Sequence, residues 1–243
     1  DYGYAVTADS TGNIYITGDV ANEMDVIKIT PTGTIAWQTR LYRGYSADNG
    51  RGIAVDGSGN VYVVGDTYTD YTHYTDILLV KYNSTGAIQW QKLIYRTTSV
   101  EESGYGIALD SSNNIHIIAR YYSGSTWDMY VAKLTTDGVF VWQRSIATTG
   151  TDYGFGITVD TSGNVYVTGN LYQTSYDRAF VAKFDLNGNL QWQQTFLGNS
   201  STYGRAIQVD ASGNVYMSGY SYFNATTRDI ILVKLTPAGV VVW

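Results

Sequence analysis

Residues 159–169 read Val-Asp-Thr-Ser-Gly-Asn-Val-Tyr-Val-Thr-Gly and predict a tight hairpin between two strands. Asp160 can accept hydrogen bonds from the backbone N–H groups of the turn, and Gly163 can adopt the positive φ that a short turn needs. Residues 165–167 then start a strand, because β-branched and aromatic residues favour an extended backbone.

This turn belongs to a repeat that runs through the whole chain. The spacing Gly-x5-Asp-x3-Asn occurs at Gly3/Asp9/Asn13, Gly50/Asp56/Asn60, Gly104/Asp110/Asn114, Gly154/Asp160/Asn164 and Gly204/Asp210/Asn214. A second spacing, Lys-x4-Gly-x3-Trp, follows each copy at Lys28/Gly33/Trp37, Lys81/Gly86/Trp90, Lys133/Gly138/Trp142, Lys183/Gly188/Trp192 and Lys234/Gly239/Trp243. A fixed period of roughly 50 residues indicates tandem copies of one supersecondary unit.

Each unit reads as four short strands, which in the second copy are residues 50–56, 60–65, 76–82 and 87–95. Evenly spaced short strands with one fixed aromatic residue per unit are typical of a propeller. The sequence therefore predicts an all-β, five-bladed β-propeller with four antiparallel strands per blade. The predicted blades of this single domain (residues 1–243) are 1–47, 48–101, 102–151, 152–201 and 202–243.

The five blades are expected to close into one ring. An open arc is the alternative, because the chain stops at Trp243, inside its predicted last strand.

Two turn sequences support the hairpin interpretation. In the third repeat the turn glycine is replaced by Asn113, and asparagine tolerates the left-handed region well. The turn Thr30-Pro31-Thr32-Gly33 has proline second and glycine fourth, which suits a type I turn.

Composition excludes several classes of function. The net charge of −6 and the pI near 4.7 argue against nucleic acid or an anionic membrane as partner. The chain has no cysteine and two histidines, so a thiolate metal site or a nucleophilic triad is not expected, and no cofactor is predicted. No apolar run reaches the length of a membrane helix, and the first residues already belong to a repeat, so no signal peptide is expected.

The repeats resemble the SBBP-type β-propeller repeats of bacteria and archaea. The resemblance is carried by residues 159–169, by Phe180-Val181-Ala182-Lys183-Phe184 and by residues 188–192. It implies a large secreted or surface-exposed protein, hence an extracellular or cell-surface location, and it supplies no catalytic motif.

Variation between repeats is concentrated in the connections from the second to the third strand. Ten residues separate Gly18 from Lys28, whereas sixteen separate Gly65 from Lys81. These connections are rich in aromatic residues, including Tyr71 and Trp127. Because binding residues concentrate on loops that a rigid scaffold holds, this end of the blades is the predicted binding face.

A second candidate is the second residue of each predicted first strand. These residues are Tyr4, Arg51, Tyr105, Phe155 and Arg205, and each is followed by glycine or alanine. Arginine beside an aromatic ring can form a structural cation–π stack or bind an anionic ligand, and the sequence leaves both open. The candidate ligand-binding residues are therefore Tyr4, Arg51, Tyr71, Tyr105, Trp127, Phe155 and Arg205, with no catalytic or metal-binding residue.

The other recurring residues are interpreted as structural. The hairpin aspartates and the tryptophans recur in every repeat, whereas a catalytic residue need appear only once. The recurring lysines are expected to pack their stems along the blade. His116 takes the place that tyrosine has in the other repeats and is interpreted as a packing variant.

The sequence thus favours a non-catalytic extracellular module, monomeric as a domain, that recognises a glycan or a surface protein. One alternative is a propeller-type glycoside hydrolase, whose carboxylates would come from Asp19, Asp66, Asp70 and Glu101. The other is an architectural spacer in a larger surface protein.

Overall fold

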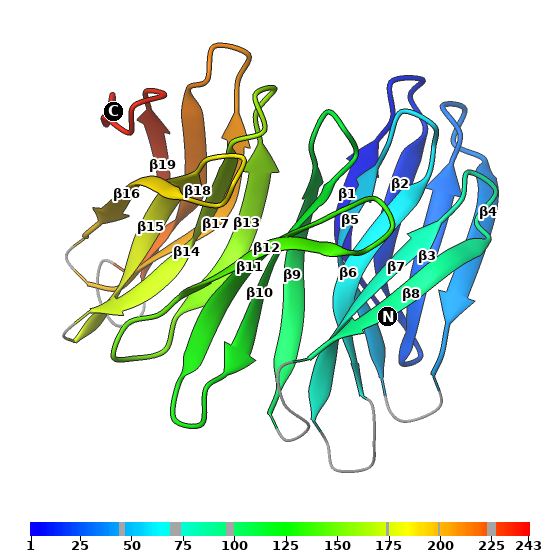
Figure 1. Cartoon of the computed structure of the whole chain (residues 1–243), viewed down its shortest axis with the longest axis horizontal. Helices are drawn as coiled ribbons and strands as arrows, with labels where there is room; N and C mark the ends of the chain where they lie inside the picture. Colours follow the sequence, from blue (N-terminus) through cyan, green and yellow to red (C-terminus); the bar gives the residue numbers. More distant parts are fainter. Residues whose placement is uncertain (44–46, 69–73, 96–99, 174, 199, 223–226) are drawn as a thin grey trace. The chain divides into compact units, whose positions relative to one another are not determined.

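The computed structural model describes residues 1–43, 47–68, 74–95, 100–173, 175–198, 200–222 and 227–243. These residues form antiparallel sheets, and each sheet consists of strands that are consecutive in the chain (Figure 1). The first sheet contains β1 (Tyr2–Ala8), β2 (Ile14–Val20), β3 (Glu23–Ile29) and β4 (Ile35–Leu41), and the second contains β5 (Asp48–Val55), β6 (Val61–Tyr68), β7 (Thr75–Tyr82) and β8 (Ile88–Ile94). The third contains β9 (Glu102–Leu109), β10 (Ile115–Tyr122), β11 (Trp127–Leu134) and β12 (Phe140–Ile146), and the fourth contains β13 (Tyr153–Val159), β14 (Val165–Gln173), β15 (Tyr176–Phe184) and β16 (Leu190–Phe196). The fifth contains β17 (Thr202–Val209), β18 (Val215–Tyr222) and β19 (Arg228–Leu235).

The all-β prediction is confirmed, with one correction in the last repeat. The fifth sheet has three strands instead of four. After β19 the chain makes only an isolated bridge between Leu235 and Val241, and the backbone of Trp243 accepts a hydrogen bond from Lys234 at 2.9 Å. The residues that follow the turn make too few pairing contacts with β19 to form a fourth strand. Among the described residues, no helix has the length and apolar character that crossing a bilayer requires.

The chain divides into two compact units, Asp1–Ile107 and Ala108–Trp243, and the boundary falls inside β9. The first unit holds the first and second sheets, and the second unit holds the fourth and fifth. Strands begin at Asp48, Glu102, Tyr153 and Thr202, close to the predicted starts of the repeats. The division of residues 1–243 into blades, and the closure of a ring, remain predictions.

The hairpin turns have the predicted chemistry. In the first repeat the N–H of Asp9 donates to Asn13 at 3.0 Å and the N–H of Gly12 donates back to Asp9 at 3.1 Å, which is a type I turn followed by a left-handed residue. The Asp9 carboxylate accepts from the N–H groups of Thr11 and Asn13. Gly12 has φ 85° and Asn113, its counterpart in the third repeat, has φ 61°. The hairpin aspartates are therefore confirmed as structural.

The buried core of each unit lies between neighbouring sheets. In the first unit Met24 and Val26 of β3 pack with Ile53, Val61 and residues of β7 in the second sheet. In the second unit Ala179 and Val181 of β15 pack in the same way with Ile207 and Val215 of the fifth sheet. The third strand of one repeat thus covers the first and second strands of the next.

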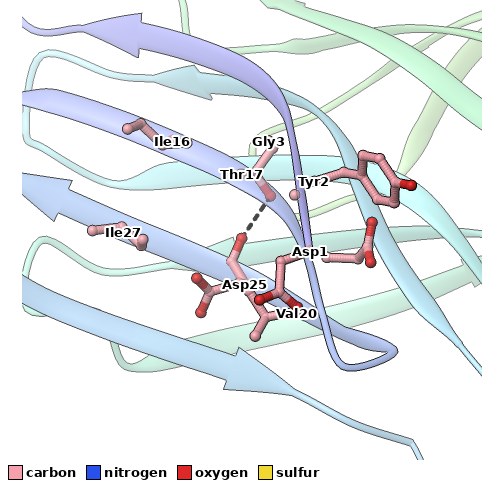
Figure 2. A pocket seen from close by; sticks show the side chains of 10 residues that line it. Asp1, Tyr2, Gly3, Ile16, Thr17, Val20, Asp25 and Ile27 are labelled. Atoms are coloured by element: carbon pink, nitrogen blue, oxygen red, sulfur yellow. Dashed lines mark hydrogen bonds between the residues drawn. The ribbon is translucent and has the colours of Figure 1, made fainter.

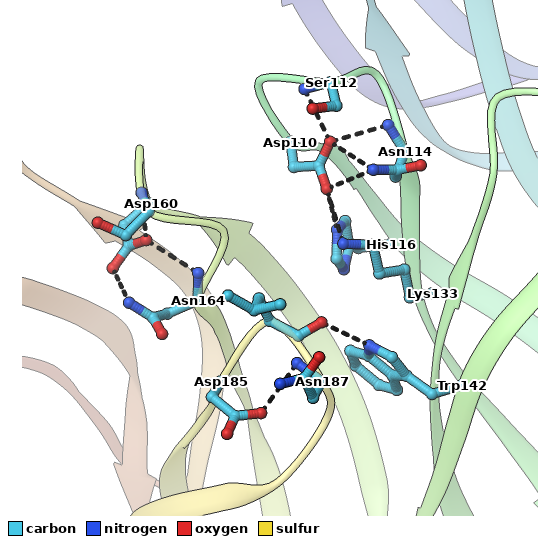
Figure 3. Close-up of polar contacts among 12 residues, drawn as sticks. Asp110, Ser112, Asn114, His116, Lys133, Trp142, Asp160, Asn164, Asp185 and Asn187 are labelled. Carbon is cyan, nitrogen blue, oxygen red and sulfur yellow. Dashed lines mark hydrogen bonds and ion pairs between the residues drawn. The ribbon is translucent and has the colours of Figure 1, made fainter.

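Three of the recurring tryptophans, Trp37, Trp142 and Trp192, contact the following repeat, which the sequence did not reveal. The indole of Trp142 is 8% exposed, and its N–H donates to the carbonyl of Leu186 in the next repeat at 3.1 Å (Figure 3). Trp37 donates likewise to Ser84, and Trp192 to Pro237. A Cβ added at Gly188 would lie 2.6 Å from the ring of Trp142. The glycine of the second motif therefore leaves room for the tryptophan of the preceding repeat.

Candidate functional site

A β-bulge lies in the first strand of four sheets, and its extra residue is the candidate site residue. The pairing between the first and second strands shifts at Tyr4, Arg51, Phe155 and Arg205. Opposite each bulge the second strand has a glycine, at Gly18, Gly65, Gly169 and Gly219, where a Cβ would collide with the first-strand backbone. A bulge redirects the side chain of its extra residue, and that residue has no pairing partner in the neighbouring strand.

The bulge explains why small residues flank these positions in the sequence. Arg51 lies between Gly50 and Gly52, and Phe155 lies between Gly154 and Gly156. Glycine on both sides of a large residue in a strand is a signal for a bulge.

In the first unit Arg51 stacks with two other candidate residues. The guanidinium of Arg51 lies 5.4 Å from the ring centroid of Tyr4 and 5.4 Å from that of Tyr105. It also forms an ion pair with Asp66, whose carboxylate is buried and accepts a second hydrogen bond from Asn49 at 2.8 Å. Here the structural cation–π interpretation holds, and the charge of Arg51 is already matched.

In this arrangement, one of the carboxylates on which the glycoside hydrolase alternative depends is already engaged. Asp66 is engaged by Arg51 and Asn49. Asp70 lies outside the described residues. No group of acidic or histidine residues that could hold a metal ion occurs among the residues with a described position.

In the second unit the bulged residues form an open group, which we term the aromatic–arginine cluster. Its members are Phe155, Tyr203, Arg205, Tyr220, Tyr222 and Arg228. The guanidinium of Arg205 lies 4.0 Å from the ring centroid of Phe155 and 5.2 Å from that of Tyr220, and it donates to the Tyr220 hydroxyl at 2.9 Å. The guanidinium of Arg228 lies 5.1 Å from the same Tyr220 ring and 5.0 Å from that of Tyr222.

The cluster contains two exposed arginines. Arg205 and Arg228 are both exposed, and among the described residues neither forms a salt bridge. The Tyr203 and Tyr220 rings stack with centroids 4.9 Å apart. Burial and a hydrogen bond to Asp177 raise the pKa of Tyr203 to about 12, so its phenol stays neutral and donates to that carboxylate at 2.8 Å. The cluster is thus a fixed aromatic surface with two guanidinium groups on it.

Of the two candidate residues in the variable connections, the structure describes Trp127, which lies in a strand instead of a loop. Trp127 is the first residue of β11 and pairs with Tyr122, the last residue of β10. Its ring lies 4.1 Å from the guanidinium of Arg120 and 5.5 Å from the Tyr122 ring. The strands run further than predicted because tyrosine and tryptophan extend a ladder readily. Tyr71 lies outside the described residues.

These contacts change what a Trp127 variant should do. The sequence placed Trp127 in a loop between strands, and substitutions of exposed loop residues usually change stability little. Its half-buried ring instead contacts Arg120 and Tyr122. Removal of the Trp127 side chain is therefore expected to lower the stability of the protein as well.

The recurring lysines lie over tyrosine rings in four repeats. The ammonium groups of Lys28, Lys81 and Lys183 lie 5.2 Å from the ring centroids of Tyr15, Tyr62 and Tyr166, and that of Lys234 lies 5.3 Å from the centroid of Tyr216. In the third repeat His116 replaces the tyrosine and accordingly Lys133 forms an ion pair with Asp110 at 3.0 Å (Figure 3). His116 is fully buried and contacts the same Asp110 at 3.3 Å, as the tyrosine hydroxyls contact their hairpin aspartates. The packing-variant interpretation is confirmed.

His116 gives the second unit a pH-dependent stability. Burial lowers the pKa of His116 to about 4, below its ordinary value of 6.5. The unfolded chain therefore binds a proton between pH 6.5 and 4 that the folded chain does not bind, and stability falls as the pH falls through this window, by at most about 3 kcal/mol.

His116→Tyr restores the residue of the other repeats and removes this proton. We expect the melting temperature of the wild type to fall more steeply than that of His116→Tyr between pH 6.5 and 4. Parallel curves for the two proteins would show that His116 does not titrate differently on folding.

Two segments of the chain, residues 39–72 and 141–170, match the β-propeller repeat family SBBP. These two segments are SBBP β-propeller repeats. Both matched segments begin in the fourth strand of one sheet and include the first strand of the next sheet. The SBBP sequence unit therefore does not start and end where the sheets do. No curated protein sequence matches the chain.

Several solved structures are similar in fold to this chain. A protein of unknown function from Dyadobacter fermentans has a TM-score of 0.67 at 11% identity, with 94% of this chain and 74% of that chain covered. A putative exo-β-1,3-galactanase from Bifidobacterium bifidum has a TM-score of 0.55 at 14% identity, with 98% and 90% covered. A gluconolactonase from Xanthomonas campestris has a TM-score of 0.53 at 11% identity, with 90% and 69% covered. At these identities the likeness extends to the fold alone.

Proposed function

We propose that this chain is a non-catalytic carbohydrate-binding module whose five sheets are the blades of a β-propeller. The aromatic–arginine cluster is the binding site. The observation that carries the proposal is the pair of exposed guanidinium groups, Arg205 and Arg228, which share the Tyr220 ring and form no salt bridge among the described residues.

The chemistry of the cluster selects the class of ligand. Aromatic rings offer flat apolar area that suits the C–H face of a sugar, and their hydroxyls offer hydrogen bonds. A guanidinium binds a carboxylate with two parallel hydrogen bonds. A sugar that carries a carboxylate, as in a uronic acid, uses both features at once. Glycans of this kind occur at cell surfaces, which fits an extracellular location.

The cluster is also preorganised for binding. Phe155 and Arg205 lie on bulges that the strands hold in place, and Tyr203 is fixed by its hydrogen bond to Asp177. Side chains held in this way lose little conformational freedom when a ligand binds.

Arg205→Ala tests the proposal. We expect wild-type protein to bind a tetramer of galacturonic acid more tightly than a neutral galactose tetramer in isothermal titration calorimetry. Arg205→Ala should lower the affinity for the acidic tetramer at least tenfold, and added salt should weaken wild-type binding because the contact is ionic.

Arg40→Ala is the control, because Arg40 is an exposed arginine of β4 that lies outside the cluster and pairs with Glu23 and Asp25. Equal loss with both variants would point to general charge attraction. The same titration mixtures, assayed for new reducing ends, test the absence of catalysis. Release of shorter oligosaccharides would favour the hydrolase alternative, and no binding of either tetramer would favour the architectural spacer.

A further inference from the structure

We propose that the binding site extends beyond the aromatic–arginine cluster and holds an acidic polysaccharide through the carboxylates of two different sugars. This inference rests on the proposed function and extends it from a class of sugar to a chain of several sugars. The added part of the site is a third arginine, Arg120, with its aromatic neighbours Trp127 and Tyr153. All three residues belong to the second unit, as the cluster does.

The guanidinium of Arg120 contacts rings of two neighbouring sheets. It lies 4.1 Å from the ring centroid of Trp127 in its own sheet and 5.4 Å from that of Tyr153, the first residue of β13 in the fourth sheet. All three side chains are half-buried, so part of each reaches the surface.

Arg205 of the cluster has an equivalent arrangement on the other side of the fourth sheet. Its guanidinium contacts Tyr220 in its own sheet and Phe155 in the fourth sheet. Each of these two arginines therefore has one aromatic ring from its own sheet and one ring from β13. The fourth sheet supplies an aromatic residue to an arginine on either side of it.

A stacked pair of rings connects the two arginines. The ring centroids of Tyr153 and Phe155 lie 6.0 Å apart, with an angle of 22° between the ring planes. The contacts thus form one continuous series over the third, fourth and fifth sheets, which we term the aromatic–arginine row. In order, the row contains Trp127, Arg120, Tyr153, Phe155, Arg205 and Tyr220.

The row determines how long a ligand must be to use the whole site. A guanidinium that stacks on an aromatic ring directs its N–H groups outward in its own plane, where a carboxylate can accept two parallel hydrogen bonds. Because two rings separate Arg120 from Arg205, one sugar carboxylate cannot contact both. A chain can contact both while its sugars lie over Tyr153 and Phe155. The second carboxylate then binds within a molecule that is already held, so affinity should rise steeply with chain length.

The hollow on the first sheet does not suit the same ligand. It has a volume of about 180 Å³, and Ile16 and Ile27 line it (Figure 2). Among the described residues, the charged side chains that line it are those of Asp1, Asp19 and Asp25. These carboxylates repel a chain of acidic sugars. An acidic chain is therefore expected on the row, whose charged side chains are arginines.

Isothermal titration calorimetry of the whole chain with galacturonic acid oligosaccharides of increasing length tests the row. We expect the wild type to bind the hexasaccharide at least tenfold more tightly than the disaccharide. Arg120→Gln should lower the affinity for the hexasaccharide at least tenfold and change the affinity for the disaccharide less than twofold. Retained disaccharide binding also shows that the variant is folded and that its cluster is intact.

Two further variants complete the test. Arg144→Gln is the matched control, because the guanidinium of Arg144 also lies over a tryptophan ring of the third sheet, 5.8 Å from the centroid of Trp142, but outside the row. It should bind both oligosaccharides as the wild type does. Arg120→Lys keeps a positive charge over Trp127 and replaces Arg120→Gln if that variant does not fold. It should also lose hexasaccharide affinity, because an ammonium group cannot form the two parallel hydrogen bonds.

The outcomes separate this inference from the proposed function. Equal affinity of the wild type for the two oligosaccharides, or unchanged hexasaccharide binding in the folded Arg120 variant, would overturn the row and leave the cluster as the binding site. Equal losses in the Arg120 and Arg144 variants would overturn the row in favour of general charge attraction. If the wild type bound no oligosaccharide of any length, both the row and the proposed function would be wrong.

Discussion

We expect Trp142→Ala to lower the free energy of unfolding by about 3–5 kcal/mol, the usual cost of deleting a buried aromatic side chain. The variant loses the indole that lies over Gly188, its hydrogen bond to Leu186, and its contact with Phe184 at 6.4 Å between ring centroids. Because the indole joins two repeats, the cavity cannot be filled by movement within one sheet. The melting temperature should fall by roughly 6–20 °C.

Trp243→Ala is the matched control for this prediction. Trp243 occupies the same position of the second motif but is 55% exposed. In dilute solution its removal should change stability by less than about 1 kcal/mol. Similar melting temperatures for the two variants would show that the tryptophan contact between repeats contributes little.

We expect Gly169→Val to have the second large effect, because it acts on the backbone of the binding site. A Cβ at Gly169 would collide with the carbonyl oxygen of Tyr153, and no side-chain rotation relieves a clash with backbone. The strands β13 and β14 must separate or lose the bulge at Phe155. Stability should fall by roughly 3 kcal/mol, the upper end for overpacked sites, and affinity for the acidic tetramer at least tenfold.

Valine is chosen here because the third repeat has Ala119 at the equivalent position, so alanine is tolerated in at least one sheet. Gly57→Val is the control, since a Cβ there meets nothing within 4 Å. Stability is measured by thermal unfolding and affinity by calorimetry. A Gly169→Val protein with wild-type stability and affinity would show that the bulge does not depend on this glycine.

The parts of the fold that depend on local sequence could be predicted. The Asp-x-x-Gly-Asn turns follow from hydrogen bonds within five residues, and Asn113 at φ 61° even marks the left-handed position. The strands follow from residue type, although their ends do not, because Trp127 and Tyr122 continue a ladder where a loop was expected.

Contacts between repeats could not be predicted from spacing alone. The motif Lys-x4-Gly-x3-Trp places a glycine and a tryptophan four residues apart, yet Gly188 contacts Trp142 of the preceding repeat. The candidate site was found in part. The sequence singled out Phe155 and Arg205, but it missed Tyr220 and Arg228, which come from other strands and meet Arg205 and each other only in the folded sheet.

The most direct test of carbohydrate recognition is a titration followed by NMR of the arginine side-chain Nε–H groups. On addition of the galacturonic acid tetramer, we predict that the signals of Arg205 and Arg228 shift in a saturable way. The signals of Arg40 and Arg51 should stay in place, because Arg40 lies outside the cluster and Arg51 is paired with Asp66. Saturable shifts at Arg40 or Arg51 with Arg205 and Arg228 unchanged, or no shift at any arginine, would contradict the assignment of the binding site.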